Sequence, residues 1–305
     1  MYYDIAVIGA GPAGLSAALY ARRAGLSVAV LEGGIYGGQI ANTPEVENYP
    51  GIAKISGVEL CMALYNQAVA QGADILLEGL EKAELTGPVK RLFTSESEHQ
   101  AGSVIIANGA KRRKLGCPGE EEFSGKGVSY CATCDGAFFR GMEVAIVGGG
   151  DTALEDALFL SNNCKKVFLI HRRDAFRGSK ILADAVIARD NIEILYDSTL
   201  ERIDGSTKVE GMTVKNKNTG ATAEYPVAAV FIAVGLVPDN SLFAGQIDLD
   251  PVGYIIAGED CKTNLEGVFA AGDTRTKILR QIVTAAADGA VSAFQAAGYL
   301  AAAKQ

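Results

Sequence analysis

The chain of 305 residues is long enough for about two domains, and its 49% hydrophobic and 21% charged content is typical of a globular protein. The net charge of −8 disfavours a nucleic-acid partner, because phosphate backbones are bound by lysine and arginine. No signal peptide is visible and no apolar stretch is long enough to span a bilayer, so we expect a cytoplasmic protein with no membrane partner.

The first expected elements are a strand at residues 4–8, a helix at 15–24 and a second strand at 27–31, which is closed by Glu32. The turn between the first strand and the helix is Gly9-Ala10-Gly11-Pro12-Ala13-Gly14. In such a unit the first glycine permits the turn, the second lets the backbone approach a pyrophosphate, and the third lets the helix pack closely on the sheet. The acid is placed to bind a ribose with a free 2′-hydroxyl, so the unit predicts a dinucleotide site.

The next stretch, residues 33–51, is rich in glycine, proline and asparagine and is expected to be a long loop of the kind that often carries function. A helix is expected at 58–71. Further on, a polar turn at 95–100 lies between two strands, and His99 is expected to be solvated there. Residues 104–110 then form a buried strand that runs into a glycine turn.

The basic run 111–114 is expected to be a solvated crossing between two domains, and it precedes a pair of cysteines followed by an acid, Cys131-Ala132-Thr133-Cys134-Asp135. Two thiols at this spacing can close a disulfide, and the carboxyl can give or take the proton that thiol exchange moves. The alternatives are half of a zinc site or two core cysteines. Zinc usually takes four cysteine or histidine ligands, and the chain has no second such pair, so we expect no metal.

The remaining cysteines have no even spacing, so they do not form the disulfide framework of a secreted domain. We expect each of them to be a lone, packed thiol: Cys61, Cys117, Cys164 and Cys261.

A second unit of strand, glycine turn, helix and strand runs from residue 143 to residue 170. Its turn is Gly148-Gly149-Gly150-Asp151-Thr152-Ala153, and its last strand ends in His171-Arg172-Arg173, with Arg177 further on. The second unit matches the first at an offset of 139 residues, pairing Gly9 with Gly148, Gly11 with Gly150, Gly14 with Ala153 and Glu32 with His171. The chain is therefore expected to contain an internal duplication with two dinucleotide-binding domains.

The two units differ at the end of their second strand. An acid there repels a 2′-phosphate, whereas arginines bind it, so the first site suits a free 2′-hydroxyl and the second suits NADP. The alternative is that the three basic residues, 171–173, form only a solvated strand end.

The tail contains another strand that ends in Gly272-Asp273, an acid that can hold hydroxyls of a flavin, and a helix at 283–303 preceded by Arg280-Gln281-Ile282. It is too short to fold alone, so we expect it to complete the first domain, with the second domain inserted. The predicted fold class is α/β with two Rossmann-like domains, one formed by 1–113 with 244–305 and the other by 114–243.

With these motifs in order, the chain resembles the bacterial low-molecular-weight thioredoxin reductases over essentially its whole length. The motifs that carry the resemblance are GAGPAG at 9–14, GGQ at 37–39, ENYPG at 47–51, CATCDG at 131–136, GGGDTA at 148–153, HRRDAFR at 171–177, and AAGD with RQIVTAA at 270–287. The resemblance implies FAD in the first domain, NADPH in the inserted domain, thioredoxin as electron acceptor and a homodimer. Two departures are Asn108, where threonine is common, and Ile282, where alanine or valine is common.

By motif match, the resemblance implies FAD contacts from Gly9, Gly11, Pro12, Ala13, Gly14, Glu32, Gly33, Gly38, Gln39, Asn48, Ala107, Gly109, Gly272, Asp273, Arg280, Gln281 and Ile282. It implies NADPH contacts from Gly148, Gly150, Asp151, Thr152, His171, Arg172, Arg173, Arg177 and Gly235. The implied catalytic residues are Cys131, Cys134 and Asp135.

The implied reaction carries electrons from NADPH through FAD to the Cys131–Cys134 disulfide, and then to thioredoxin by dithiol exchange. The resemblance assigns Cys134 to the flavin side and Cys131 to the attack on thioredoxin, and Asp135 is expected to donate a proton. Because one flavin must meet both the nicotinamide and the dithiol, the inserted domain is expected to swing on hinges near 111–117 and 238–245.

Four other functions fit parts of the pattern. A thioredoxin reductase fed by ferredoxin would lack the second glycine turn and the arginines. A reductase of another small redox protein would keep every motif. A dithiol oxidase that uses oxygen is disfavoured by the NADP motif, and a redox sensor without enzymatic activity would need no acid beside the cysteines.

Overall fold

The computed structural model describes residues 1–43 and 45–303, and the chain divides into two compact units. Unit 1 comprises Met1–Lys111 and Val237–Gln305, and unit 2 comprises Arg112–Leu236. The boundaries expected from the sequence, 113/114 and 243/244, lie two and seven residues further along the chain. The return to unit 1 comes early because the Asn108 side chain donates to the carbonyl of Asp239 at 2.7 Å and Phe243 packs in the core of unit 1.

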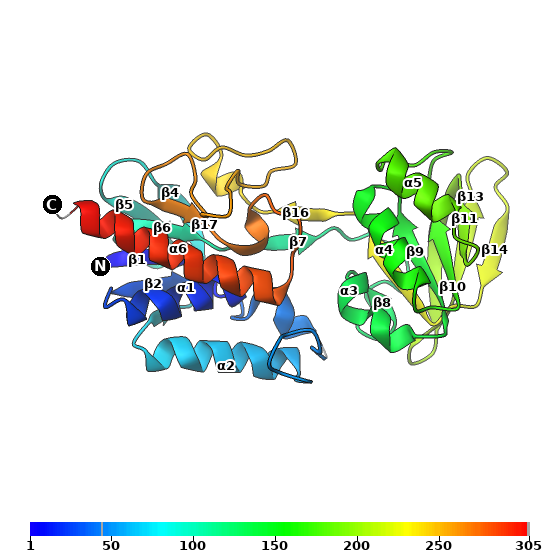
Figure 1. The fold of residues 1–305 in the computed structure, drawn as a ribbon, viewed down its shortest axis with the longest axis horizontal. Helices are drawn as coiled ribbons and strands as arrows, with labels where there is room; N and C mark the ends of the chain where they lie inside the picture. Colours follow the sequence, from blue (N-terminus) through cyan, green and yellow to red (C-terminus); the bar gives the residue numbers. More distant parts are fainter. Residues whose placement is uncertain (44, 304–305) are drawn as a thin grey trace. The chain divides into compact units, whose positions relative to one another are not determined.

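Unit 1 is built on a seven-stranded sheet in the order β3-β2-β1-β6-β5-β4, with β17 also paired to β6 (Figure 1). The strands are β1 (Tyr2–Ile8), β2 (Val28–Leu31), β3 (Asp74–Leu76), β4 (Leu80–Glu84), β5 (Lys90–Thr94), β6 (Glu98–Ile106) and β17 (Val268–Ala270). Strands β1, β2, β3, β6 and β17 are parallel, whereas β4 and β5 are antiparallel to their neighbours. The carboxyl ends of the parallel strands therefore meet at one edge of the sheet, where ligands of such folds bind.

The helices of unit 1 are α1 (Pro12–Arg23), α2 (Gly57–Ala70) and α6 (Ile282–Ala303), with short 3₁₀ turns η1 (Gly38–Asn42), η3 (Ser241–Phe243) and η4 (Gly272–Thr274). Helix α1 lies between α6 and α2 (Figure 1). It packs closely on α6 because a Cβ at Gly289 would lie 2.1 Å from the carbonyl of Ala13, and Ser16 Oγ donates to the Ala286 carbonyl at 2.7 Å. The tail thus completes unit 1 through β17 and α6, as expected from the sequence.

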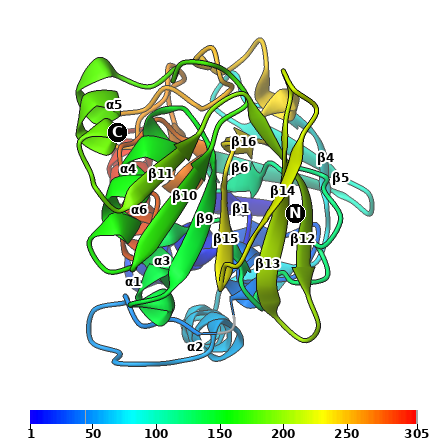
Figure 2. The ribbon, with the colours of Figure 1, turned by 90° about the vertical axis from the view of Figure 1, so that its right-hand side faces the viewer.

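Unit 2 contains a five-stranded parallel sheet in the order β11-β10-β9-β15-β8 and a three-stranded antiparallel sheet (Figure 2). The parallel strands are β8 (Val128–Ser129), β9 (Glu143–Gly148), β10 (Lys166–Ile170), β11 (Ile192–Leu195) and β15 (Ala229–Ala233). The antiparallel strands are β12 (Ser198–Gly205), β13 (Val209–Asn216) and β14 (Thr222–Tyr225). The helices are α3 (Ala132–Asp135), η2 (Gly136–Phe139), α4 (Asp151–Ser161) and α5 (Lys180–Ile187).

The two connections between the units carry short strands, β7 (Ala110–Arg112) and β16 (Leu236–Pro238), which pair with each other.

The predicted duplication is confirmed by the strand order of the two parallel sheets. The order β3-β2-β1-β6 in unit 1 has its counterpart in β11-β10-β9-β15 in unit 2, and all these pairs are parallel.

The expectation that His99 lies in a solvated loop is wrong. The polar turn is confined to residues 95–97, and β6 already begins at Glu98. His99 is 4% exposed, and its Nε2 lies 2.9 Å from the Glu78 carboxylate. The alternation of side chains along the strand turns His99 inward, toward the ring of Tyr3.

Candidate active site and dinucleotide sites

Cys131 and Cys134 form a disulfide at the start of α3, with their Cα atoms 5.3 Å apart. Cys131 is the extended residue that caps the helix, and the amide of Asp135 donates to the Cys131 carbonyl at 3.1 Å, which closes the first turn. The other four cysteines are free thiols, as expected. The structure therefore holds one redox-capable pair on a short helix of unit 2.

Asp135 is held beside this pair by a residue that sequence reasoning missed. Ser129 Oγ donates to Asp135 Oδ2 at 2.5 Å and accepts from the Cys131 amide at 3.1 Å. Burial raises the pKa of Asp135, while the hydrogen bond from Ser129 and the charge of Arg112 act in the opposite direction. A carboxyl with a raised pKa keeps its proton to a higher pH than an ordinary aspartate, as a proton donor near neutral pH requires. The hydroxyl two residues before the cysteine pair was the signal for Ser129 in the sequence.

The glycine turn of unit 1 places Gly11, which has no side chain, at the start of α1. Gly9 has φ +101° and its Cβ would lie 2.5 Å from the Ala107 carbonyl, while a Cβ on Gly14 would lie 1.8 Å from the Gly9 carbonyl. Gly11 caps α1, and a Cβ there would meet nothing within 4 Å. Two glycines are thus needed for close packing, and the third faces open space at the positive end of a helix, where a phosphate can approach.

Four more of the predicted FAD residues lie close to this turn. Glu32 follows β2 and accepts from the amides of Ala10 at 2.8 Å and Gly34 at 2.9 Å. A Cβ on Gly38 would lie 3.5 Å from the Gly11 Cα, and a Cβ on Gly272 would lie 2.9 Å from the Ala13 Cβ. The last of the four, Ala107, follows β6 and is the residue whose carbonyl Gly9 approaches.

Asp273 carries an unmatched acceptor. It lies in η4, directly after β17, and its Oδ1 is buried without a hydrogen-bond partner in the described part of the chain. Burial raises the pKa of Asp273, and the charges of Lys277 and Arg280 oppose this shift. Buried polar atoms in native proteins are almost always paired, so this oxygen fits a hydroxyl of a bound ligand.

Several of the other predicted FAD residues of unit 1 contact neighbouring residues through their side chains. Gln39 donates to the Ala110 carbonyl, just beyond Gly109. Asn48 Nδ2 donates to Gln281 Oε1 at 3.1 Å, immediately before α6 begins at Ile282. Arg280 stacks on the ring of Tyr254 at 4.1 Å. Gly33 is exposed at the end of β2, and Pro12 is the first residue of α1.

The glycine turn of unit 2 repeats the open feature of the first turn. Gly150 caps α4, and a Cβ there would meet nothing within 4 Å, as at Gly11. Asp151 and Thr152 are exposed at the start of α4, and Gly235 follows β15 with φ +107°. This helix start is therefore also free to receive a phosphate.

The basic residues after β10 fall into two groups. Arg172, Arg173 and Arg177 are exposed, and within residues 1–43 and 45–303 their guanidinium groups form no hydrogen bond or ion pair. His171 differs from them because it is 5% exposed. Its ring nitrogens lie 2.8 Å from the Gly148 carbonyl and 2.9 Å from the Ala175 carbonyl.

Comparison with known proteins agrees with this arrangement. The family model described as pyridine nucleotide-disulphide oxidoreductase matches residues 3–289. The thioredoxin reductase of Peptoclostridium acidaminophilum is 46% identical over 305 residues, covering 98% of this chain and 97% of that protein. The crystal structure of thioredoxin reductase from Streptococcus pyogenes MGAS5005 superposes with a TM-score of 0.94 at 43% identity and covers 99% of each chain. The chain belongs to the thioredoxin reductases of this family.

As a thioredoxin reductase, the chain is an oxidoreductase with Rossmann-type domains, and its family implies a pyridine nucleotide and a flavin. A ferredoxin-flavin thioredoxin reductase from Clostridium acetobutylicum is less similar, with 31% identity, a TM-score of 0.55, and coverage of 100% of this chain and 99% of that chain. In the described part of the reductase, no helix has the length and apolar character needed to cross a membrane.

A second residue missed by sequence reasoning is Asp288, which holds the turn that carries Asp273. Asp288 Oδ2 accepts from the Gly272 amide at 2.9 Å, and its carboxylate also binds Arg275 and Lys277 at 2.8 Å. Burial alone would raise the pKa of Asp288, but the hydrogen bonds from Arg275 and Lys277 lower it below its ordinary value. The signal in the sequence was an acid within a helix of small residues.

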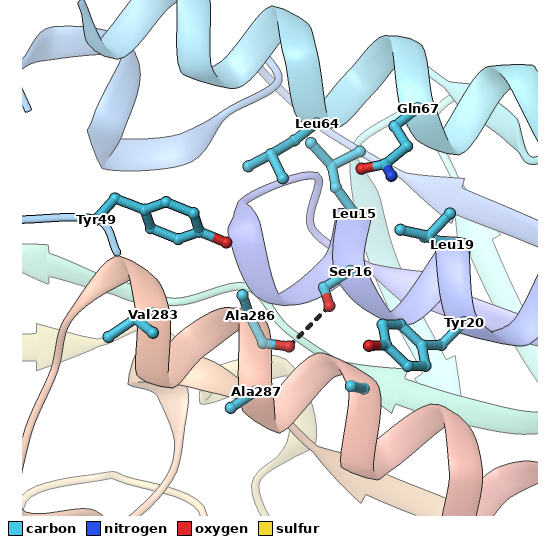
Figure 3. A pocket seen from close by; sticks show the side chains of 11 residues that line it. Leu15, Ser16, Leu19, Tyr20, Tyr49, Leu64, Gln67, Val283, Ala286 and Ala287 are labelled. Atoms are coloured by element: carbon cyan, nitrogen blue, oxygen red, sulfur yellow. Dashed lines mark hydrogen bonds between the residues drawn. The ribbon is translucent and has the colours of Figure 1, made fainter. Parts of the chain in front are cut away.

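Unit 1 of the reductase also holds a pocket of about 340 Å³ between α1, α2 and α6 (Figure 3). Its lining residues are mostly apolar: Leu15, Ser16, Leu19, Tyr20, Tyr49, Leu64, Gln67, Val283, Ala286, Ala287 and Ala290. No predicted FAD residue is among these described residues, so the pocket is separate from the cofactor set.

Proposed function

We propose that the chain is an NADPH-dependent thioredoxin reductase that holds FAD in unit 1 and NADPH in unit 2. The observation that carries the proposal is that the Cys131–Cys134 disulfide, with Asp135, lies on the same unit as a glycine turn followed by three exposed arginines. The relatives named thioredoxin reductase support thioredoxin as the electron acceptor.

The residues of unit 1 fit FAD. Asp273 Oδ1 is a buried acceptor with no hydrogen-bond partner among the described residues, so it can accept from a hydroxyl of the cofactor. The start of α1 at Gly11 has open space beside it and suits a pyrophosphate. Glu32 has acceptor capacity left for ribose hydroxyls beyond its two backbone partners. When bound, FAD would supply the hydride chemistry that links NADPH to the disulfide, which no side chain of the chain can provide.

The residues of unit 2 fit NADPH rather than a ferredoxin input. The helix start at Gly150 suits the pyrophosphate, and exposed guanidinium groups bind a 2′-phosphate with paired, charge-assisted hydrogen bonds. An enzyme supplied with electrons by ferredoxin needs neither feature.

The reduced cysteine pair would transfer two electrons by thiol exchange. The Cys131 thiolate attacks the disulfide of thioredoxin, so that one thioredoxin sulfur leaves as a thiolate and a mixed disulfide forms. The Cys134 thiolate then attacks the Cys131 sulfur, which re-forms the Cys131–Cys134 disulfide and releases reduced thioredoxin. Asp135 lies beside the pair and supplies or accepts the proton that each exchange moves.

The decisive assay is NADPH oxidation by the purified holoenzyme, with a bacterial thioredoxin, a glutaredoxin-like protein or a peroxiredoxin-like protein as the only acceptor. Rapid turnover with thioredoxin alone supports the proposal. Rapid turnover only with one of the other proteins would make the chain a reductase of that protein. Turnover with oxygen alone would make it an oxidase.

A homodimer and a cytoplasmic location belong to the same proposal. The α6 residues that line the pocket are apolar, and Tyr20 of α1, which also lines it, is 50% exposed (Figure 3). Phe294, four residues beyond the last α6 residue of the lining, Ala290, is 77% exposed. Exposed apolar patches of this kind often mark an interface. Light scattering should give the mass of two chains for the wild type and of one chain for Phe294→Asp; a monomeric wild type would contradict the dimer.

A further inference from the structure

Asn108 carries a buried side-chain oxygen that has no hydrogen-bond partner. Its Oδ1 is one of three buried side-chain atoms that form no hydrogen bond among the described residues, and a second of them is Asp273 Oδ1. Unpaired buried acceptors are rare in native proteins. Two of them in the same part of unit 1 therefore indicate a ligand that brings hydrogen-bond donors.

The neighbours of Asn108 decide which of its two terminal atoms is the oxygen. Its Nδ2 donates to the carbonyl of Asp239 at 2.7 Å and to Asn240 Oδ1 at 3.1 Å. A backbone carbonyl can only accept a hydrogen bond, so the NH₂ group must point at Asp239. The amide of Asn240 is fixed in the same way, because its Nδ2 donates to the carbonyls of Gly253 at 2.9 Å and Thr274 at 3.2 Å. The unpartnered atom of Asn108 is therefore an acceptor.

The fold connects Asn108 to the turn that carries Asp273. Asn108 follows β6 and Asp273 follows β17, and β17 pairs in parallel with the last three residues of β6, Val104–Ile106. Thr274, the neighbour of Asp273, donates through Oγ1 to Asn240 Oδ1 at 2.8 Å, and the same oxygen accepts from Asn108. Asn240 is buried, so one buried amide holds both turns and places the two unpaired oxygens in one hydrogen-bonded cluster.

The carboxyl edge of the sheet gives the order in which the parts of a dinucleotide would lie. Across the sheet the strands run β2, β1, β6 and β17, and the residues that follow them are Glu32, Gly11, Asn108 and Asp273. With the adenosine ribose at Glu32 and the pyrophosphate at Gly11, the flavin half of FAD would lie toward Asn108.

Asn108 also lies close to the glycine turn, since a Cβ on Gly9 would be 3.0 Å from the Asn108 Cα. The part of the flavin half that is nearest to the pyrophosphate is the sugar-alcohol chain, and its hydroxyl groups are hydrogen-bond donors. The ring N–H of the flavin is at the far end of the cofactor. A hydroxyl of the chain is therefore the donor that suits Asn108 Oδ1.

We propose that Asn108 is a cofactor-binding residue whose Oδ1 accepts a hydrogen bond from a hydroxyl of the sugar-alcohol chain of FAD, in addition to the hydroxyl expected at Asp273. This inference deepens the proposed function and rests on it, since it assumes that unit 1 holds FAD. A threonine in place of Asn108 would end one bond earlier, so the contact belongs to a chain with asparagine at this position.

The first test separates binding of FAD from support of the fold. A residue that only supports the fold stabilises the protein equally with and without FAD, whereas a contact to FAD adds stability only when FAD is bound. We expect Asn108→Ala to bind FAD about tenfold more weakly than the wild type, measured as free FAD after ultrafiltration of the holoenzyme. The rise in melting temperature that saturating FAD gives to the FAD-free protein should also be smaller in this variant.

Asn264→Ala is the matched control. Asn264 also connects two segments of unit 1, since its Nδ2 donates to the Gln246 carbonyl and its Oδ1 accepts from the Asp248 amide, both at 3.0 Å. Because both atoms have protein partners, this variant should keep the wild-type affinity for FAD. Asn108→Thr gives the same comparison if Asn108→Ala does not fold, because threonine is common at this position in the enzymes that the sequence resembles.

The second test identifies the donor. FAD analogues that each lack one hydroxyl of the chain are bound to the wild type and to Asn108→Ala, and the losses in affinity are compared as a double-mutant cycle. We expect one analogue to bind the wild type about tenfold more weakly than FAD does, and to bind Asn108→Ala as tightly as FAD does. If every analogue loses the same affinity in both proteins, the hydroxyl contact is refuted.

The outcomes separate this inference from the proposed function. An Asn108→Ala variant with unchanged affinity for FAD, whose melting temperature falls equally with and without FAD, would show that Oδ1 serves only the fold and would leave the proposed function intact. A wild type that binds no FAD would refute the cofactor of unit 1 and the proposed function with it.

Discussion

Two single residues, Ser129 and Asp135, control the proton beside the cysteine pair. Burial raises the pKa of Asp135, and the hydrogen bond from Ser129 limits that rise. As an acid, Asp135 is active while protonated, so proton donation is present below its raised pKa and is lost as the pH rises through it. The same residue with an ordinary pKa would already be ionised at neutral pH.

We predict that Asp135→Asn leaves the reaction of the holoenzyme with NADPH fast and slows thioredoxin reduction by about 10² or more. Ser129→Ala removes a hydrogen bond that lowers the pKa of Asp135, so the alkaline limb of its pH–rate profile should move to higher pH. Stopped-flow traces and pH profiles check both. Unchanged kinetics in Asp135→Asn would mean that Asp135 only completes the short helix.

The exposed arginines of the loop after β10 should also set the preference for NADPH over NADH. Each charge-assisted hydrogen bond to a 2′-phosphate is worth about 1.5–3 kcal/mol, and each 1.4 kcal/mol is about tenfold, so two contacts give roughly 10² to 10⁴ in kcat/KM for NADPH over NADH. The double variant Arg172→Ala/Arg173→Ala should lose most of this ratio in steady-state assays. Arg189→Ala, which alters an exposed arginine outside the loop, is the matched control and should keep it.

At the scale of elements, α4 combines a start suited to phosphate with a half-buried acid, Asp156, one turn further along. Burial raises the pKa of Asp156 to about 7, and the neighbouring charge of Glu155 adds to the shift. The unfolded chain releases this proton at a lower pH than the folded chain, so stability is lost as the pH rises from about 4 to about 7.

Asp156→Asn should therefore raise the melting temperature, and by more at about pH 8 than at about pH 5, in thermal unfolding followed by circular dichroism. Glu155→Gln removes only the like charge and should give a smaller gain with the same sign. A loss of stability in Asp156→Asn that is equal at both pH values would show that the acid is held by contacts rather than penalised by burial.

The elements also show what the sequence could and could not predict. The β1–α1–β2 and β9–α4–β10 units were predictable because glycine turns and buried strands are local patterns, and the offset of 139 residues linked them. The contacts of Ser129, Asp288 and His171 were not predictable, since each depends on backbone groups brought close by the folded chain. His99 was misjudged because a polar run hid the start of a strand.

At the scale of the whole molecule, the insertion of one unit into the other was predictable because the tail is too short to fold alone. The seven-residue difference at the return connection arises from tertiary contacts of Asn108 and Phe243, which no local pattern reveals. The swing of the inserted domain stays a prediction, which a cross-link between the units tests: an enzyme that still cycles when cross-linked would contradict it.

The central claim is that Cys131 and Cys134 pass electrons to thioredoxin with different roles, and trapping tests it most directly. The measurement is the amount of covalent complex formed with a thioredoxin whose resolving cysteine is replaced, read on a non-reducing gel. Cys134→Ser should leave Cys131 free to form a lasting mixed disulfide, and Cys131→Ser should form none. A complex with Cys131→Ser alone would reverse the roles, and no complex with either variant would contradict thioredoxin as the partner.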